Sequence, residues 1–328
     1  MKYDKIKVVQ INTFPYKATG SIMMNIHNRL LEEQYDSYVV WGRGRAAQNE
    51  HEIVIQDEFG VKLHGVYTRI TDKTGFASKK ATRKLIDKLQ QIEPDILHLH
   101  NIHGYYLNIE LLFNYIRENN IKVVWTLHDC WAFTGHCAYF DMVGCKKWKI
   151  GCHDCEQKKS YPSSLIKDNS TGIGEKRSLF TNLNITLVTP CKWLKNIVRQ
   201  SFLKEYSVEV IYNGIDLSTF HPETTDFEEK YNLQGKYVIL GVASEWTNRK
   251  GLKDFIKLEE MLDKTKYRIV LVGLTEKQIE ELPDTIIGIK RTQNIQELVG
   301  IYTRANVFFN PTYEDNFPTT NLEAIACG

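Results

Sequence analysis

The chain has 328 residues, which suggests two domains that are each large enough to hold a hydrophobic core. Its 42 basic and 40 acidic residues give a net charge of +2, which excludes the strongly basic surface of a nucleic-acid-binding protein. No run approaches the roughly 20 apolar residues of a membrane span, and the N-terminus lacks the apolar core of a signal peptide. Seven cysteines, an odd number, argue against a disulfide framework. We therefore expect a cytoplasmic protein.

The N-terminal half alternates apolar runs with amphipathic segments, a pattern typical of an α/β fold. The run Ile6–Ile11 predicts a first strand, followed by a loop to Gly20 and a helix that Ser21 would cap. A glycine at this bend either lets a ligand approach the backbone or only permits a tight turn. Further strands are predicted at residues 37–41, 53–55, 94–100, 123–129, 185–189 and 208–211.

Residues 76–91 predict an amphipathic helix with a strongly basic face. A basic amphipathic helix can lie on an anionic membrane, here the inner face of the cytoplasmic membrane. Such charges more often form a solvated face. Peripheral membrane contact is therefore one of two interpretations of this helix, whose cations are Lys79, Lys80, Arg83, Lys84 and Lys88.

Histidines gather at the ends of two predicted strands. His128 and Asp129 end the strand at 123–129, and the carboxyl ends of parallel strands are where open α/β sheets place ligand groups. The alternative is a core histidine hydrogen-bonded to a neighbouring carbonyl. His98 and His100 share one face of the preceding strand, where packing is favoured over metal ligation because no carboxylate accompanies them at ligand spacing.

A cysteine-rich segment spans residues 130–160. Cys152 and Cys155 have the spacing of a metal-ligand pair, and four thiolates would suit tetrahedral zinc. The other spacings are unusual for a zinc ribbon, and His136 or His153 could replace one thiolate. A structural zinc and free thiols remain alternatives, whereas catalysis is not expected because four protein ligands leave no open position. The four thiols are Cys137, Cys145, Cys152 and Cys155.

The C-terminal half predicts a second doubly wound unit, with strands at 237–243, 267–273 and 286–289. Arg249 and Lys250 follow its first strand, and two cations suit a diphosphate.

The last stretch begins with a short strand at 306–309, continues as a loop, and predicts a helix from about Thr319 with Leu322, Ile325 and Ala326 buried. The N-terminus of this helix is an anion site, which Asp315 and Glu323 would flank. Alternatively, Thr320 and Glu323 form only a capping box.

The stretch Asn310–Gly328 resembles the Glu–seven residues–Glu signature of the retaining glycosyltransferases of family 4. Asp315 stands at the first Glu, Phe317 and Glu323 match, and Asn316 and Pro318 replace two glycines. The resemblance implies the GT-B fold, with two Rossmann-like domains facing a cleft.

The resemblance also implies roles for particular residues. Glu323 would bind the donor ribose, while Asp315 and the backbone of Asn316, Phe317, Pro318, Thr319 and Thr320 would hold the sugar and diphosphate. It further implies that Gly20 faces the cleft, that His128 with Asp129 contacts the donor sugar, and that Arg249 and Lys250 bind the diphosphate, although the family's usual Arg position holds Glu245.

The implied activity is retaining, metal-independent transfer of a hexose-type sugar from a nucleotide-sugar donor to a glycan or lipid-linked acceptor. Bacterial exopolysaccharide, capsule and O-antigen enzymes with a comparable cysteine-rich insertion have this role. Residues 1–215 would form the acceptor domain and 216–328 the donor domain, which we expect to be incomplete because family members continue beyond this point. The alternatives are a non-catalytic nucleotide-sugar-binding partner subunit and a cysteine-metal interaction module.

Overall fold

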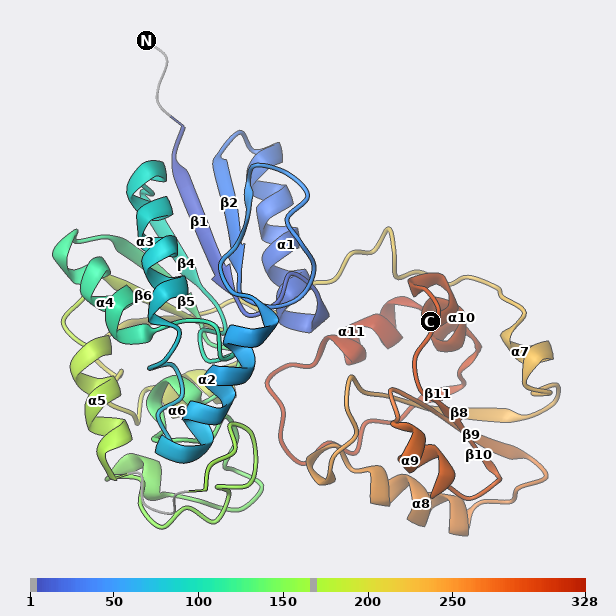
Figure 1. The fold of residues 1–328 in the computed structure, drawn as a ribbon. Helices are drawn as coiled ribbons and strands as arrows, with labels where there is room; N and C mark the ends of the chain where they lie inside the picture. Colours follow the sequence, from blue (N-terminus) through green and yellow to red (C-terminus); the bar gives the residue numbers. More distant parts are fainter. Residues whose placement is uncertain (1–4, 166–169) are drawn as a thin grey trace. The chain divides into compact units, whose positions relative to one another are not determined.

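The computed structural model describes residues 5–165 and 170–328, which divide into two compact units, 1–212 and 213–328. Each unit is a parallel β-sheet with helices packed on it (Figure 1), as the alternating pattern predicts.

The first unit contains a seven-stranded sheet in the order β3-β2-β1-β4-β5-β6-β7, and every recorded strand pair is parallel. The order reverses between β1 and β4, which makes their carboxyl ends the switch point where such folds bind ligands. The strands are β1 (Lys7–Asn12), β2 (Asp36–Trp41), β3 (Glu52–Val54), β4 (Ile96–Leu99), β5 (Lys122–Thr126), β6 (Ile185–Thr189) and β7 (Ser207–Val210). The helices are α1 (Lys17–Glu32), α2 (Glu58–Thr71), α3 (Lys79–Ile92), α4 (Ile109–Glu118), α5 (Ser170–Phe180) and α6 (Lys192–Val198).

The second unit contains a four-stranded parallel sheet in the order β10-β9-β8-β11. Its switch point lies between β8 and β11, so the segments that follow these two strands meet at one edge. The strands are β8 (Tyr237–Val242), β9 (Tyr267–Val272), β10 (Ile286–Ile289) and β11 (Val307–Phe308). The helices are α7 (Phe227–Lys230), α8 (Leu252–Met261), α9 (Glu276–Glu280), α10 (Ile295–Arg304) and α11 (Thr319–Ala326).

The central strands are near-continuous apolar runs because both faces of each sheet are covered. Val9, Ile11, Leu97 and Leu99 on β1 and β4 are fully buried in the first core. Val238 and Leu240 on β8 are likewise fully buried in the second. The strands predicted from these apolar runs are therefore confirmed.

The prediction for the start of α1 was wrong. The helix begins at Lys17 with Tyr16 as its N-cap, so Ser21 lies inside it. Gly20 is buried in the first turn, and a Cβ there would lie 2.6 Å from the carbonyl oxygen of Phe14. The group that approaches Gly20 closely is therefore the chain's own backbone.

The predicted buried face of α11 was also partly wrong, because Ile325 is 77% exposed. Ala324 and Cys327 pack against the second core instead, and Glu323 bonds to Tyr302 on α10. These contacts set the rotation of the helix and turn Ile325 outward.

On α3 the side chains of Leu85 and Leu89 are fully buried, Ile86 and Ile92 are partly buried against the same core, and the predicted basic residues are exposed. Within the residues described, no helix is both long and apolar enough to span a bilayer.

Candidate functional site

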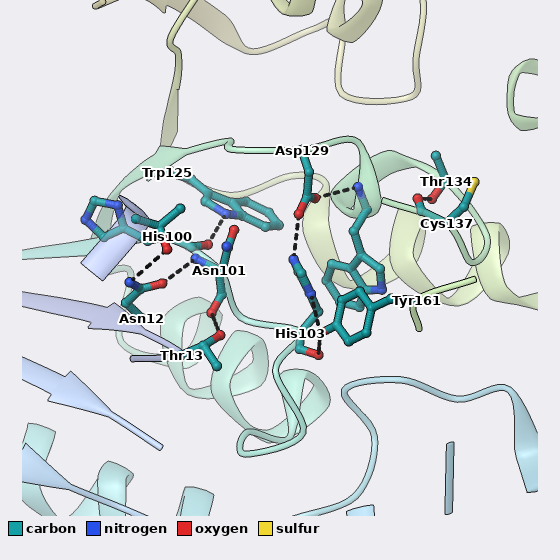
Figure 2. A network of polar contacts seen from close by, with 12 residues as sticks. Asn12, Thr13, His100, Asn101, His103, Trp125, Asp129, Thr134, Cys137 and Tyr161 are labelled. Carbon is teal, nitrogen blue, oxygen red and sulfur yellow. Dashed lines mark hydrogen bonds and ion pairs between the residues drawn. The ribbon is translucent and has the colours of Figure 1, made fainter. Parts of the chain in front are cut away.

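The carboxyl ends of β1, β4 and β5 bring polar side chains together in the first unit (Figure 2). Asn12 Oδ1 accepts a hydrogen bond from the Asn101 N–H at 3.2 Å, and the Thr13 hydroxyl donates to the Asn101 carbonyl at 3.0 Å. These bonds join the switch-point strands β1 and β4. His100 and His128 line a small pocket beside them. His128 therefore lies just after the carboxyl end of β5, which stops at Thr126 rather than at the predicted residue 129.

A chain of hydrogen bonds fixes the ring tautomer of His128. Gln10 Nε2 donates to the Met23 carbonyl at 3.3 Å, which leaves Gln10 Oε1 as acceptor for His100 Nε2–H at 3.3 Å. His100 Nδ1 must then accept from His128 Nε2–H at 3.0 Å. Burial lowers the pKa of His128 to about 4 and the pKa of His100 well below its ordinary value. At neutral pH both rings are uncharged.

His98 packs as expected. Its ring lies 4.2 Å from that of His100, and its Nε2 lies 2.8 Å from the Thr126 hydroxyl. Burial, with the nearby His128, lowers the pKa of His98 to about 4.

Asp129 does not stand alone beside His128 but pairs with His103, as Figure 2 shows. The Tyr161 hydroxyl donates to the His103 carbonyl at 3.0 Å, and the same oxygen lies 3.1 Å from His103 Nδ1. Asp129 Oδ2 accepts from His103 Nε2–H at 2.9 Å. Both ring nitrogens of His103 therefore have a polar partner, Asp129 on one side and Tyr161 on the other.

The Asp129 carboxylate is stabilised in its charged form. Burial alone would raise the pKa of Asp129, but the charge and hydrogen bond of His103 lower it below its ordinary value. The Trp131 N–H, 2.9 Å from Asp129 Oδ1, adds to this effect. Sequence reasoning assigned no role to His103 or Tyr161, which lie 58 residues apart and carry no local signal of their contact.

In the second unit, the segments that follow β8 and β11 meet at the switch point. Lys250 Nζ forms an ion pair with Asp315, and both side chains are mostly buried. The Arg249 guanidinium donates to the Glu314 carbonyl, and the Tyr313 N–H donates to the Arg249 carbonyl at 2.9 Å. The structure therefore brings together the cations and the carboxylate that the sequence predicted for one site, and it anchors Arg249 on the backbone of the other loop.

Gly251 makes this close approach feasible. Its φ is +76°, and a Cβ at this position would lie 2.6 Å from the Pro311 carbonyl oxygen. Any larger residue would clash with that backbone and would also strain its own. The two loops are packed backbone to backbone at this glycine.

The N-terminus of α11 has no side-chain cap. Its N-cap is Pro318, whose ring carries no hydrogen-bond acceptor, and the first N–H groups of a helix have no partner within the helix. The alternative capping box is wrong, because Thr320 lies within the first turn rather than at the cap.

Just before the helix, Phe317 has a φ of +60°, and its carbonyl accepts a hydrogen bond from Asn213 Nδ2 at 2.9 Å. The Asn316 N–H donates to the neighbouring side chain, Asp315 Oδ1, at 2.8 Å.

Glu323 lies one turn into α11 and is held from two sides. Its Oε2 accepts from the Tyr302 hydroxyl at 2.9 Å, and the Thr319 side chain is a second hydrogen-bond partner. Burial raises the pKa of Glu323 above its ordinary value. Tyr302 belongs to α10, and nothing in the sequence pattern marks it as the partner of Glu323.

The four predicted thiols line one pocket of about 190 Å³, together with His136. All are free cysteines. Among residues 5–165 and 170–328, no three or more histidine, cysteine or acidic side chains are already arranged to hold a metal ion. The zinc stays a prediction. The thiols belong to Cys137, Cys145, Cys152 and Cys155.

Comparison with known proteins finds similarity to glycosyl transferases. The curated relative WcaC of Escherichia coli K12, a "putative colanic acid biosynthesis glycosyl transferase", is 25% identical over 268 residues, which cover 75% of this chain and 64% of WcaC. The chain thus spans less than two thirds of that relative's length.

Solved structures share the fold at low sequence identity. Sucrose-phosphate synthase from Thermosynechococcus elongatus superposes with a TM-score of 0.70 at 14% identity, covering 99% of this chain and 80% of the other. HepE from Anabaena, solved with UDP-glucose, superposes with a TM-score of 0.62 at 12% identity, covering 98% and 78%. The two α/β units therefore have the GT-B fold.

Family profiles cover nearly the whole chain. Residues 223–328 match the profile of glycosyl transferases group 1, and residues 20–219 match that of glycosyltransferase family 4. The chain therefore belongs to glycosyltransferase family 4.

Proposed function

We propose that this chain is a retaining glycosyltransferase that moves a hexose-type sugar from a nucleotide-sugar donor to a glycan or lipid-linked acceptor in cell-surface polysaccharide biosynthesis. The observation that carries the proposal is the meeting of Lys250, Asp315 and the uncapped N-terminus of α11 at the switch point of the second sheet. WcaC is named for colanic acid biosynthesis and HepE was solved with UDP-glucose, which supports a nucleotide-sugar donor and a polysaccharide product.

The donor diphosphate has a chemically apt site here. Negative charge grows on the diphosphate as the bond to the sugar breaks, and fixed donors and cations that face it lower the barrier. Lys250 supplies a cation and α11 supplies backbone N–H groups with the positive end of its dipole. Asp315 holds Lys250 in position before the donor binds. Transfer by this route uses protein groups in place of a metal ion.

Retention follows a front-face route in this proposal. The acceptor hydroxyl oxygen bonds to the anomeric carbon, the carbon–oxygen bond to the diphosphate breaks, and the acceptor proton passes to the departing diphosphate. Glu323 binds the ribose hydroxyls, and His128 orients hydroxyls of the transferred sugar. A neutral imidazole of fixed tautomer suits that task because it offers a directed polar atom without a charge.

A lipid-linked acceptor is supported by the outer face of α2. Phe59, Leu63, Val66 and Ile70 are 69%, 54%, 50% and 58% exposed, and the spacing of these four residues puts them on one stripe of the helix. Leu165, which is 74% exposed, continues the stripe because its N–H bonds to the Arg69 carbonyl at the end of α2.

The stripe has the properties of a membrane-contact surface. Lys62 and Arg69 lie along one side of it, so apolar insertion and attraction to anionic lipid act together. The membrane contact proposed here therefore lies on α2, and the exposed charges of α3 add only electrostatic attraction. In this proposal the enzyme is cytoplasmic and binds the inner face of the membrane.

Donor binding is tested by calorimetry with UDP-, GDP-, ADP- and dTDP-sugars. One nucleotide should bind, and Glu323→Gln should weaken it at least tenfold. Glu280→Gln, an exposed carboxylate on α9, is the matched control and should bind normally. A folded chain that binds none of the four sugars would overturn the donor site.

Transfer is tested with the same donor and membrane-extracted acceptors. His128→Ala should lose turnover while keeping donor affinity, and the anomeric configuration of the product, read by NMR, should match that of the donor. Donor binding without any turnover in the unsubstituted protein would favour the alternative, a non-catalytic nucleotide-sugar-binding partner subunit.

Membrane contact is tested by co-sedimentation with vesicles that contain anionic lipid. Replacing Leu63 and Ile70 together by Gln should abolish binding, while Lys79→Gln on α3 should weaken it only slightly. Equal binding by both variants would show that α2 is not the contact surface.

A further inference from the structure

The long connection between β5 and β6 carries a pocket that the proposed transfer reaction does not use. Its walls include the thiols of Cys137, Cys145, Cys152 and Cys155, with the ring of His136 among them. Sulfur and imidazole are the donors that zinc and other thiophilic cations prefer.

His136 is the second, independent sign of a ligand. The ring is 2% exposed, and its Nδ1 lies 2.6 Å from Asp72 Oδ1 at the C-terminus of α2. Across the residues described, its Nε2 has no hydrogen-bond partner. A buried polar atom left in this way costs about 1–3 kcal/mol, so native proteins nearly always supply a partner.

The pairing with Asp72 gives Nε2 the character of a metal ligand. Because the carboxylate bonds to Nδ1, Nε2 is the ring nitrogen left to act as a metal ligand. Metal-bound histidines are oriented by a carboxylate in the same way, and that partner also raises the basicity of the ring.

One sulfur already receives a hydrogen bond from the backbone. The Gly135 N–H donates to Cys152 Sγ at 3.3 Å. The bond therefore places Cys152 Sγ beside the residue that precedes His136. Gly135 and Cys152 are 17 residues apart, so the bond also holds the two ends of the cysteine segment together.

We propose that this pocket binds one zinc ion through His136 Nε2 and thiolates of the surrounding cysteines, with Asp72 orienting the histidine. No three of these described side chains are yet arranged around a common point, so the thiols close on the ion as it binds. Full coordination by protein ligands makes the site structural. The ion fixes the turn that links the cysteines to Asp129, and the inference stands independently of the proposed sugar transfer.

The test begins with zinc content. The full chain, purified in reducing buffer without chelator, should carry about one zinc per molecule by plasma mass spectrometry. Cys152→Ser and His136→Gln should each lose it, whereas Cys191→Ser, a half-buried thiol outside the pocket, should retain it. Asp72→Asn should weaken zinc affinity roughly 10–100-fold in competition with a chelator, as other orienting partners do. Cobalt should replace zinc and give the absorption of a tetrahedral thiolate complex.

Stability gives a second measurement that does not depend on the variants folding. Removing zinc from the unsubstituted protein with a chelator should lower the melting temperature, and adding zinc should restore it. A metal-free chain whose thiols all react with a thiol reagent would overturn the proposal. So would a disulfide within the segment, zinc retained in both pocket variants, or a melting temperature that chelation leaves unchanged. Donor binding should be measured on the same samples. It reports on the proposed function, whereas zinc content and melting temperature report on the metal site, so failure of one proposal can be told from failure of the other.

Discussion

His64 provides a sharp test of how the first unit is held together. Its Nε2 accepts from the Gly75 N–H at 3.2 Å, so its Nδ1 carries the proton and donates to the Ser78 hydroxyl at 2.7 Å. A second proton on Nε2 would face the Gly75 N–H and break that bond. The ring is 1% exposed, and burial lowers its pKa to about 4.

The direction of the pH effect follows from these two states. The unfolded chain binds a proton on this ring below about pH 6.5, whereas the folded protein does so only below about 4. Acid therefore favours the unfolded state across this window. The full effect is about 3.4 kcal/mol at 1.36 kcal/mol per pKa unit, of which about 1.3 kcal/mol is lost between pH 7.5 and 5.5.

The assay is urea unfolding of the unsubstituted protein and of His64→Gln at both pH values. The glutamine does not titrate, so its free energy of unfolding should fall by about 1.3 kcal/mol less than that of the unsubstituted protein. His51→Gln, a half-buried histidine on the same unit, is the control and should leave the difference unchanged. If the free energy of unfolding fell by the same amount in the unsubstituted protein and in His64→Gln, the reasoning would be refuted.

Three further predictions concern the candidate site. Tyr302→Phe removes the hydroxyl that holds Glu323, and we expect donor affinity to fall by about 1 kcal/mol, or roughly fivefold, in calorimetry; an unchanged affinity would mean that Glu323 is positioned by Thr319 alone. Lys250→Ala should lower kcat by roughly 10²–10³ through lost stabilisation of the leaving diphosphate, and an effect on KM alone would contradict this role. Gln10→Leu leaves the His100 ring without its acceptor and should destabilise the first unit by about 1–3 kcal/mol in urea unfolding, with a loss below 0.5 kcal/mol arguing against the tautomer chain.

The sequence predicts most of this fold because the sheets are parallel and buried on both faces. Such strands are short apolar runs bounded by turns, and their carboxyl ends share one edge of the sheet. That rule was enough to expect His128 at one edge and Lys250 near Asp315 at another. To apply this rule, one needs to predict only where each strand ends.

Contacts that depend on helix rotation or on long connections could not be predicted in this way. The bond between Tyr302 and Glu323 joins two helices across 21 residues, and it is part of what turns Ile325 outward. An apolar residue at helical spacing indicates one face, but it does not say whether another element covers that face. The exposed stripe on α2 and the buried apolar side of α3 differ for this reason, since only packing distinguishes them.

The order of strands in the first sheet also governs how the site comes into being. β1 pairs with β4, and the Lys7 backbone N–H bonds to an Asp95 carboxylate oxygen 88 residues later in the chain. At about 5–20 residues per second, a ribosome needs roughly 4–18 s to synthesise that separation. During this interval the edge of β1 that later pairs with β4 has unpaired backbone groups. Strands of other chains can form hydrogen bonds with such an edge. Since distant parallel pairing is intrinsically slow, the histidine site forms late, and a nascent chain stalled before β4 is the form most in need of a chaperone.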